Sequence, residues 1–165
     1  MPEQPDPISA ALNNIGSLKG LEQDRKPERI LLCSQQPNPA LAQYCEHEGI
    51  NLENCQTLDE LETLGRFDAA LVVDWLEHRP HIEGIQLLAR LRNLHTPHIW
   101  LMLKDTPSWS MSDLIGLGFH RQNQQQHEDQ NSSSYVYRLE SYNHKRSWNS
   151  PKHWANPQNW GKYWW

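Results

Sequence analysis

Two short runs of consecutive apolar residues stand out along the chain, at 69–73 (AALVV) and 99–103 (IWLML). Continuous apolar runs predict strands that are covered on both faces, and such strands belong to parallel sheets. Between them, Ile82, Ile85, Leu88 and Leu91 recur at helical spacing, which predicts a helix with one apolar face. Two parallel strands joined by a helix form a right-handed crossover. The segment 66–104 therefore predicts the central unit of an α/β sheet.

The remaining segments extend this pattern on both sides. Residues 30–33 and 50–56 predict two further strands, each followed by a helix: Asn38-Pro39 starts one, which ends at Gly49, and Thr57 starts the other. Ser110 has the capping pattern of a short helix that ends at Gly118. Residues 119–122 begin another strand, and the alternating segment 135–142 predicts an antiparallel strand beside it.

We therefore expect an α/β fold in three layers, with a mainly parallel sheet of five or six strands, a C-terminal antiparallel strand and helices on both faces. Three regions follow from this division. Residues 1–29 form an N-terminal arm with a short helix, 30–142 form the α/β domain, in which the polar run 122–134 is a mobile loop, and 143–165 form a tryptophan-rich segment.

Composition narrows the possible partners and location. The 165 residues include 15 basic and 20 acidic side chains, a net charge of -5, which argues against a nucleic-acid partner. No segment reaches the ~20 apolar residues of a membrane span, and we expect no signal peptide. The three cysteines lack the spacing of a disulfide framework. We expect a cytoplasmic protein with free thiols and no membrane partner.

The segment 143–165 contains five of the eight tryptophans. The prolines between them are incompatible with one long helix. Two interpretations remain open. The segment is either a clasp whose rings fill grooves of the α/β domain, or an exposed aromatic platform for a ligand or a partner.

The carboxyl ends of parallel strands are where ligands bind, and this rule places 74–81 and 104–109 at the functional edge. Asp74 can hold a ligand hydroxyl or amine, and His78, with Glu77 beside it, can move a proton near neutral pH. The structural alternative is that Asp74 and Glu77 cap the next helix or pair with Arg79. Both interpretations stay open.

A metal site is not expected. His78-x-x-His81 and His95-x-x-His98 together offer four ligands, but the crossover places the two pairs at opposite ends of the sheet. A strand of five or six residues spans ~17–20 Å, far more than a zinc ion can bridge.

The loop after the first strand, Cys33 to Gln36, lies where α/β proteins hold a nucleotide. The chain has no glycine between Arg29 and Glu48, although glycine is what lets the backbone approach a phosphate closely. Cys33 is therefore expected to be a buried thiol.

The segment from Phe67 to His78 (FDAALVVDWLEH), the sequence Leu114 to Phe119 (LIGLGF) and the strand 135–142 together resemble the class I S-adenosylmethionine-dependent methyltransferases, which have a Rossmann-like fold. The whole chain is similar to an uncharacterised family of small bacterial proteins with a degenerate methyltransferase-like fold, most specifically in its tryptophan-rich ending.

The resemblance implies site residues. Cys33, Ser34, Gln35, Gln36, Asp74 and Trp75 would line S-adenosylmethionine, and Glu77 and His78, with Trp109, would face the methyl acceptor. The chain lacks the glycine-rich loop after the first strand and the ribose-binding acid after the second, where Cys55, Gln56 and Thr57 stand. One strand–helix unit is also missing.

Three functions follow. The first is a non-catalytic module that binds a small molecule or a protein. The alternatives are an active methyltransferase with an atypical cofactor grip, and an interaction protein that uses its tryptophan-rich tail.

Overall fold

The computed structural model describes residues 27–104, 106–122, 132–142, 153, 156–159, 161 and 162. Its elements follow in the order β1 (Arg29–Cys33), α2 (Pro39–Glu48), β2 (Asn51–Cys55), α3 (Leu58–Thr63), β3 (Ala69–Val73), η1 (Leu76–His78), α4 (His81–Arg90), η2 (Leu91–His95), β4 (His98–Lys104), α5 (Met111–Gly116), β5 (His120–Arg121), β6 (Ser132–Arg138), α6 (Leu139–Tyr142) and η4 (Pro157–Asn159). The N-terminal helix expected in the arm and all five tail tryptophans lie outside the described residues.

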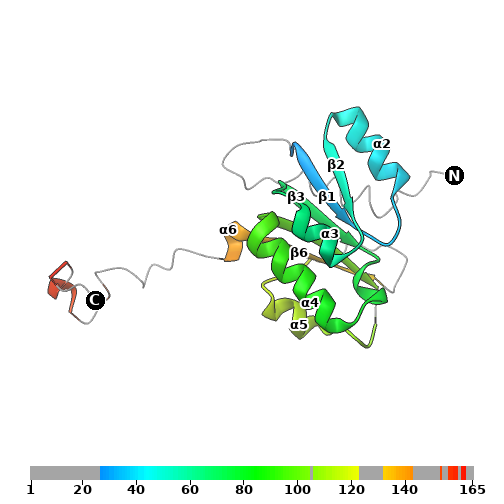
Figure 1. The fold of residues 1–165 in the computed structure, drawn as a ribbon. Helices are drawn as coiled ribbons and strands as arrows, with labels where there is room; N and C mark the ends of the chain where they lie inside the picture. Colours follow the sequence, from blue (N-terminus) through cyan, green and yellow to red (C-terminus); the bar gives the residue numbers. More distant parts are fainter. Residues whose placement is uncertain are drawn as a thin grey trace.

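The six strands form one sheet in the order β2-β1-β3-β4-β6-β5 (Figure 1). β2, β1, β3 and β4 are parallel, whereas β6 runs antiparallel to β4 and to β5. This confirms the expected α/β fold with a mainly parallel sheet and a C-terminal antiparallel strand. Because β2 lies on one side of β1 and β3 on the other, the chain reverses direction across the sheet between β1 and β3. That point is where open α/β sheets bind ligands.

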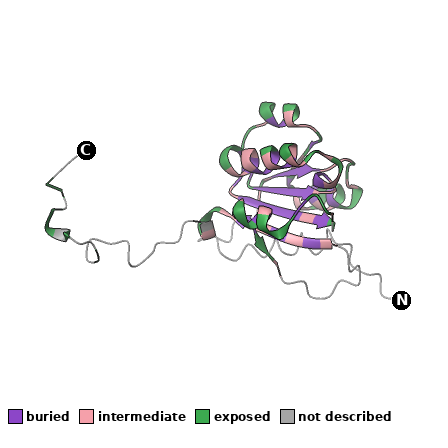
Figure 2. Ribbon diagram, turned by 90° about the horizontal axis from the view of Figure 1, so that it is seen from below, coloured by how far each residue is buried: buried purple, intermediate pink, exposed green. Residues whose placement is uncertain are grey.

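Apolar side chains are buried on both faces of the sheet (Figure 2). One face packs against α3, α4 and α5, which stand in front of the strands in Figure 1, and its core includes Leu61, Leu87 and Leu114. On the other face, Leu41 and Cys45 of α2 pack against β1. Burial on two faces explains why the central strands are apolar at every position rather than at alternate ones.

Local sequence signals set the starts of α2 and α5 and the end of α2 as expected, whereas α5 ends at Gly116 rather than at Gly118. The Asn38 side chain accepts a hydrogen bond of 2.8 Å from the Leu41 amide at the start of α2, and Gly49 ends that helix in the left-handed conformation (φ 68°). Ser110 and Asp113 form a reciprocal capping box at the start of α5. In each case a side chain or a glycine satisfies backbone groups that the helix leaves unpaired.

Two predicted elements differ from the structure. The strand expected at 135–142 spans Ser132–Arg138, so it begins inside the expected polar loop, and residues 139–142 form α6. The β6–β4 pairing ends at Arg138 opposite His98, and the next amide, of Leu139, donates to the carbonyl of Pro97. A proline has no N–H to extend the ladder.

The second difference concerns the inner face of α4. Ile82 is 61% exposed, and the helix instead buries Gly84, Leu87 and Leu88, followed by Leu91 of η2. Gly84 allows this rotation because its missing side chain leaves room for the Trp109 ring.

Candidate functional site

The chain reverses sharply where β3 ends. Asp74, the residue after β3, has a φ of 52°, and it is the only non-glycine residue in the described part of the chain with a positive φ. A left-handed backbone costs an L-residue roughly 1–2 kcal/mol, least for Asp and Asn. Such strain gathers at ligand-binding sites, because only the surrounding structure can maintain it. The left-handed conformation of Asp74 directs the chain into the turn formed by η1.

The carboxylate of Asp74 contacts the side chains of Lys104 and His78. Its Oδ1 lies 3.1 Å from Nζ of Lys104, which ends β4, and 3.2 Å from Nε2 of His78. Partial burial raises the pKa of Asp74, but the hydrogen bonds and positive charges of Lys104 and His78 outweigh it, so the pKa lies below its usual value. Asp74 is therefore a charged group near neutral pH, positioned from two sides.

Glu77 connects the same two strands in a different way. Its Oε1 accepts a hydrogen bond of 2.8 Å from the backbone amide of Lys104. Its other oxygen, Oε2, is shielded from solvent and has no hydrogen-bond partner among the described residues. Glu77 thus fixes the end of β4 with one oxygen and leaves the other available for a donor.

Unpartnered polar atoms gather at this edge of the sheet. Among the described residues, four further buried atoms here lack a hydrogen-bond partner: Nε2 of Gln35 after β1, Nε2 of His81 at the start of α4, and Oγ1 of Thr106 and Nε1 of Trp109 after β4. Each buried polar group left unpaired costs about 1–3 kcal/mol, and natural structures contain few of them. All five lie on segments that follow the carboxyl ends of β1, β3 and β4, where a ligand can complete their bonding.

Trp75 lies beneath this edge rather than on it. Its ring is 0% exposed, and its Nε1 donates a hydrogen bond of 3.0 Å to the carbonyl of Gln56 after β2. The Arg79 guanidinium reaches the same carbonyl at 3.2 Å and lies over the Trp75 ring. Trp75 therefore connects the ends of β2 and β3 as part of the core.

The loop after β1 begins from a buried thiol, as expected. Cys33 is fully buried, and the register places it opposite Val72 of β3, so Ser34 and Gln35 continue beside the end of β3. The Ser34 hydroxyl accepts a hydrogen bond from the Gln36 amide, and Gln36 itself is exposed. The loop thus lies next to Asp74, at the point where the chain reverses across the sheet.

The side chains that begin α4 and precede α5 form one wall of the edge. The rings of His81 and Trp109 are 4.4 Å apart, and Nε2 of His81 lies 3.6 Å from a carboxylate oxygen of Asp113. Trp109, expected to face a methyl acceptor, is 6% exposed and packs against Gly84. It forms the wall behind the edge.

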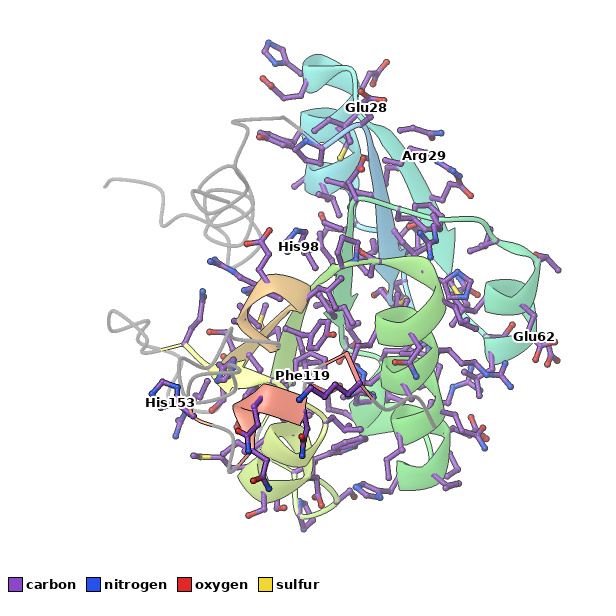
Figure 3. The ribbon with its side chains drawn as sticks, turned by 90° about the vertical axis from the view of Figure 1, so that its left-hand side faces the viewer. Glu28, Arg29, Glu62, His98, Phe119 and His153 are labelled. Carbon is purple, nitrogen blue, oxygen red and sulfur yellow. The ribbon has the colours of Figure 1, made fainter. Side chains whose placement is uncertain are left out.

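The second histidine pair lies at the opposite edge, as the crossover predicted. His98 begins β4, and Nδ1 of His95 lies 2.9 Å from the carbonyl of Gly65, before β3. Figure 3 shows His98 in the same end of the molecule as Glu28 and Arg29 at the start of β1. Among the described residues, no group of three or more histidine, cysteine or acidic side chains is arranged to hold a metal ion.

Sequence reasoning placed 104–109 at the functional edge and noted Gln56 after the second strand, but it assigned no role to three of these groups. Lys104, Thr106 and Gln56 contribute to the edge through side chains or a backbone carbonyl. The only available signal was their position directly after predicted strands. Within the part of the chain that the structure describes, no helix is long and apolar enough to cross a bilayer.

Solved structures with the same arrangement of strands and helices are methyltransferases. The methyltransferase domain of bacterial CtHen1-CN shares 8% identity at a TM-score of 0.53, covering 81% of this chain and 96% of that one. Burkholderia thailandensis 1,6-didemethyltoxoflavin-N1-methyltransferase, solved with bound 1,6-didemethyltoxoflavin and S-adenosylhomocysteine, shares 16% identity at a TM-score of 0.50, covering 78% of each chain.

A third match, Haemonchus contortus phosphoethanolamine N-methyltransferase 2, has 15% identity and a TM-score of 0.49, covering 78% of this chain; the chain spans only 36% of that protein's length. At these identities the similarity shows the fold alone. The protein has the methyltransferase-like α/β fold.

The sequence comparison is more specific. Residues 10–165 match the model of DUF6231, a family of unknown function, and the chain belongs to that family. A search of curated proteins found no significant match.

Proposed function

We propose that this chain is a methyltransferase-like domain that binds a polar small molecule or a protein at the carboxyl edge of β1, β3 and β4 and does not transfer methyl groups. The supporting observation is a group of five buried polar atoms at that edge, on Gln35, Glu77, His81, Thr106 and Trp109, that have no hydrogen-bond partner among the described residues. Together with the strained Asp74, they are the features that a bound ligand would explain.

The chemistry of the edge indicates which ligand groups fit. Asp74 and Glu77 present carboxylate oxygens, which accept hydrogen bonds, and Gln35 and Lys104 present donors. A ligand with several hydroxyl or amino groups would satisfy both kinds. In this proposal His78, which contacts Asp74, is the group that exchanges a proton with such a ligand.

The proposal that the module is non-catalytic rests on the residues at the carboxyl ends of β1 and β2. The resemblance to methyltransferases implies a glycine-rich loop after β1 and a ribose-binding acid after β2. The loop 34–38 has no glycine, and β2 ends in a buried Cys55 that packs with Cys33. The chain therefore lacks two groups that the resemblance implies for holding the cofactor.

An active methyltransferase with an atypical grip is the second candidate, and the fold favours it because two methyltransferases share this architecture. Under this proposal Cys33 to Gln36, Asp74 and Trp75 line the cofactor, while Glu77 and His78 face the acceptor. A third candidate is an interaction protein that uses the tryptophan-rich segment 143–165. A cytoplasmic location and a bacterial origin remain predictions.

Isothermal titration calorimetry with S-adenosylmethionine and S-adenosylhomocysteine separates the first two candidates. We expect no binding heat at millimolar ligand. A saturable heat with either compound, lost in Asp74→Asn, would establish the cofactor site and overturn the non-catalytic proposal.

A thermal-shift screen with nucleosides, amino acids and sugars tests ligand binding at the edge. We expect a stabilising compound whose effect is lost in Glu77→Gln. The matched control is Glu62→Gln, because Glu62 is a 60% exposed carboxylate on the outer side of α3, away from the strand ends (Figure 3). Equal stabilisation of both variants would place the binding site elsewhere, and the absence of any stabilising compound would count against a small-molecule ligand.

A further inference from the structure

Two cysteines lie side by side at the ends of neighbouring strands. Cys33 is the last residue of β1 and Cys55 the last of β2, and the parallel register pairs them directly. Both are 0% exposed, and both belong to the core on the α3 and α4 side of the sheet. Each thiol is near enough to shift the pKa of the other.

This placement is compatible with a disulfide bond. Neighbouring strands lie about 4.7–4.9 Å apart, and disulfides join Cα atoms about 4.4–6.8 Å apart. Because side chains alternate along a strand, two residues in direct register point to the same face. Cys45, the third cysteine, is buried on the opposite face with α2.

The two thiols are not chemically equivalent. The hydrogen bond with Cys55 and complete burial raise the pKa of Cys33, whereas the hydrogen bond from Cys33 lowers the pKa of Cys55. Cys55 is therefore the sulfur that reacts first as a thiolate. Its thiol also donates 3.1 Å to the carbonyl of Thr57, just beyond the strand.

Cys55 is fully buried, so an oxidant reaches it only when the edge of the sheet opens locally. β2 is an edge strand that pairs with β1 alone among the described strands, and its other four residues are exposed or half-buried. Strand ends at the edge of a sheet open locally at a lower free energy than central strands do. Opening the turn after Cys55 exposes its sulfur while β1 stays in place.

We propose that Cys33 and Cys55 form a peroxide-reactive thiol pair that closes reversibly to a disulfide at the ligand edge. The Cys55 sulfur attacks the peroxide O–O bond; an S–O bond forms, and the released hydroxide combines with the Cys55 proton as water. Cys33 then attacks the Cys55 sulfur, the S–S bond forms and the S–O bond breaks. The second hydroxide leaves as water with the Cys33 proton. In sum, two thiols and one hydrogen peroxide give one disulfide and two waters.

The test uses the folded full-length chain, treated with hydrogen peroxide, quenched and then denatured for thiol titration. We expect the wild type to lose two of its three thiols, to yield a peptide linked between Cys33 and Cys55, and to recover all three thiols with dithiothreitol. Cys45→Ser, the matched control, should lose both of its remaining thiols. Cys33→Ser and Cys55→Ser should form no intramolecular link.

Three outcomes would overturn the proposal. One is a link that includes Cys45. Another is a link that forms only when peroxide is added in denaturing urea, which would make it a property of the unfolded chain. The last is a wild type that keeps three thiols under conditions that fully oxidise free glutathione. None of these measurements requires a ligand, so they are independent of the proposed binding function.

Discussion

Nζ of Lys104 lies 3.1 Å from Oδ1 of Asp74, although thirty residues separate them in the chain. Asp74 directly follows β3 and Lys104 ends β4, and these two strands are parallel neighbours. The crossover through α4 therefore returns the chain to the same edge of the sheet. The β3–α4–β4 unit therefore creates the charged part of the candidate site.

The first prediction concerns how this contact responds to acid. Because the pKa of Asp74 is lowered in the folded state, its ionised form stabilises the fold above the unfolded-state pKa, and this contribution disappears as the pH falls through the folded-state pKa. Asp74→Asn should lower the free energy of unfolding at pH 7, and the difference from wild type should vanish in acid. With Asp74 36% and Lys104 65% exposed, the effect should stay below about 1 kcal/mol.

Urea denaturation of both proteins between neutral and acid pH measures this difference. Asparagine tolerates the left-handed backbone of position 74, so the variant isolates the charge. A difference that is constant across the pH range would contradict the assignment.

The second prediction concerns Gly84 in the middle of α4. A Cβ at this position would collide with the Trp109 ring. Gly84→Ala should therefore destabilise the protein by about 1–3 kcal/mol through overpacking, although alanine favours a helix by up to about 1 kcal/mol. Gly116→Ala is the matched control, because a Cβ there meets nothing within 4 Å.

Thermal unfolding of the two alanine variants makes the comparison. Gly116→Ala should be neutral or slightly stabilising. If Gly84→Ala were as stable as Gly116→Ala, the packing of Trp109 against α4 would be wrong.

The third prediction concerns His98, which is 6% exposed and whose ring nitrogens have no hydrogen-bond partner in the part of the chain that the structure describes. Burial lowers its pKa, assisted by the charge of Arg138 and opposed by those of Glu140 and Asp68. The unfolded chain therefore binds more protons than the folded one as the pH falls through the ordinary histidine range, and stability should fall between about pH 7 and pH 5.

His98→Leu should reduce the loss of stability between pH 7 and pH 5, measured as the change in Tm between the two pH values. His47→Leu is the control, because His47 is an 84% exposed histidine on α2. An acid sensitivity that survives in His98→Leu would place its cause in another group.

The fourth prediction distinguishes the two interpretations of the tryptophan-rich segment. Each buried aromatic removes ~150–250 Å² of surface, about 4–6 kcal/mol before entropy is subtracted. If the segment is a clasp, deleting 148–165 should lower Tm by many degrees. If it is a platform for a partner, Tm should not change and binding of that partner should be lost.

Replacing the five tail tryptophans with serine distinguishes the contribution of the aromatic rings to stability from that of the rest of the segment. If the segment is a clasp, this full-length variant should show the same fall in Tm as the deletion. An unchanged Tm in both would exclude the clasp.

Much of the fold could be read from local patterns. The apolar runs at 69–73 and 99–103 predicted β3 and β4, and the caps at Asn38 and Ser110 predicted two helix starts. These signals are reliable because burial on two faces and unpaired helix amides are local requirements. The end of β6 was less predictable, because it depends on Pro97, which lies in a different strand connection.

The sequence by itself determined the class of fold and the edge on which a site must lie, since strand direction follows from the crossover and ligands bind at carboxyl ends. Tertiary structure alone decided which side chains meet there. It placed Lys104 on Asp74, Trp75 inside the core and Cys33 against Cys55. These outcomes depend on strand register and on the rotation of each helix, which are set by packing between segments far apart in the chain.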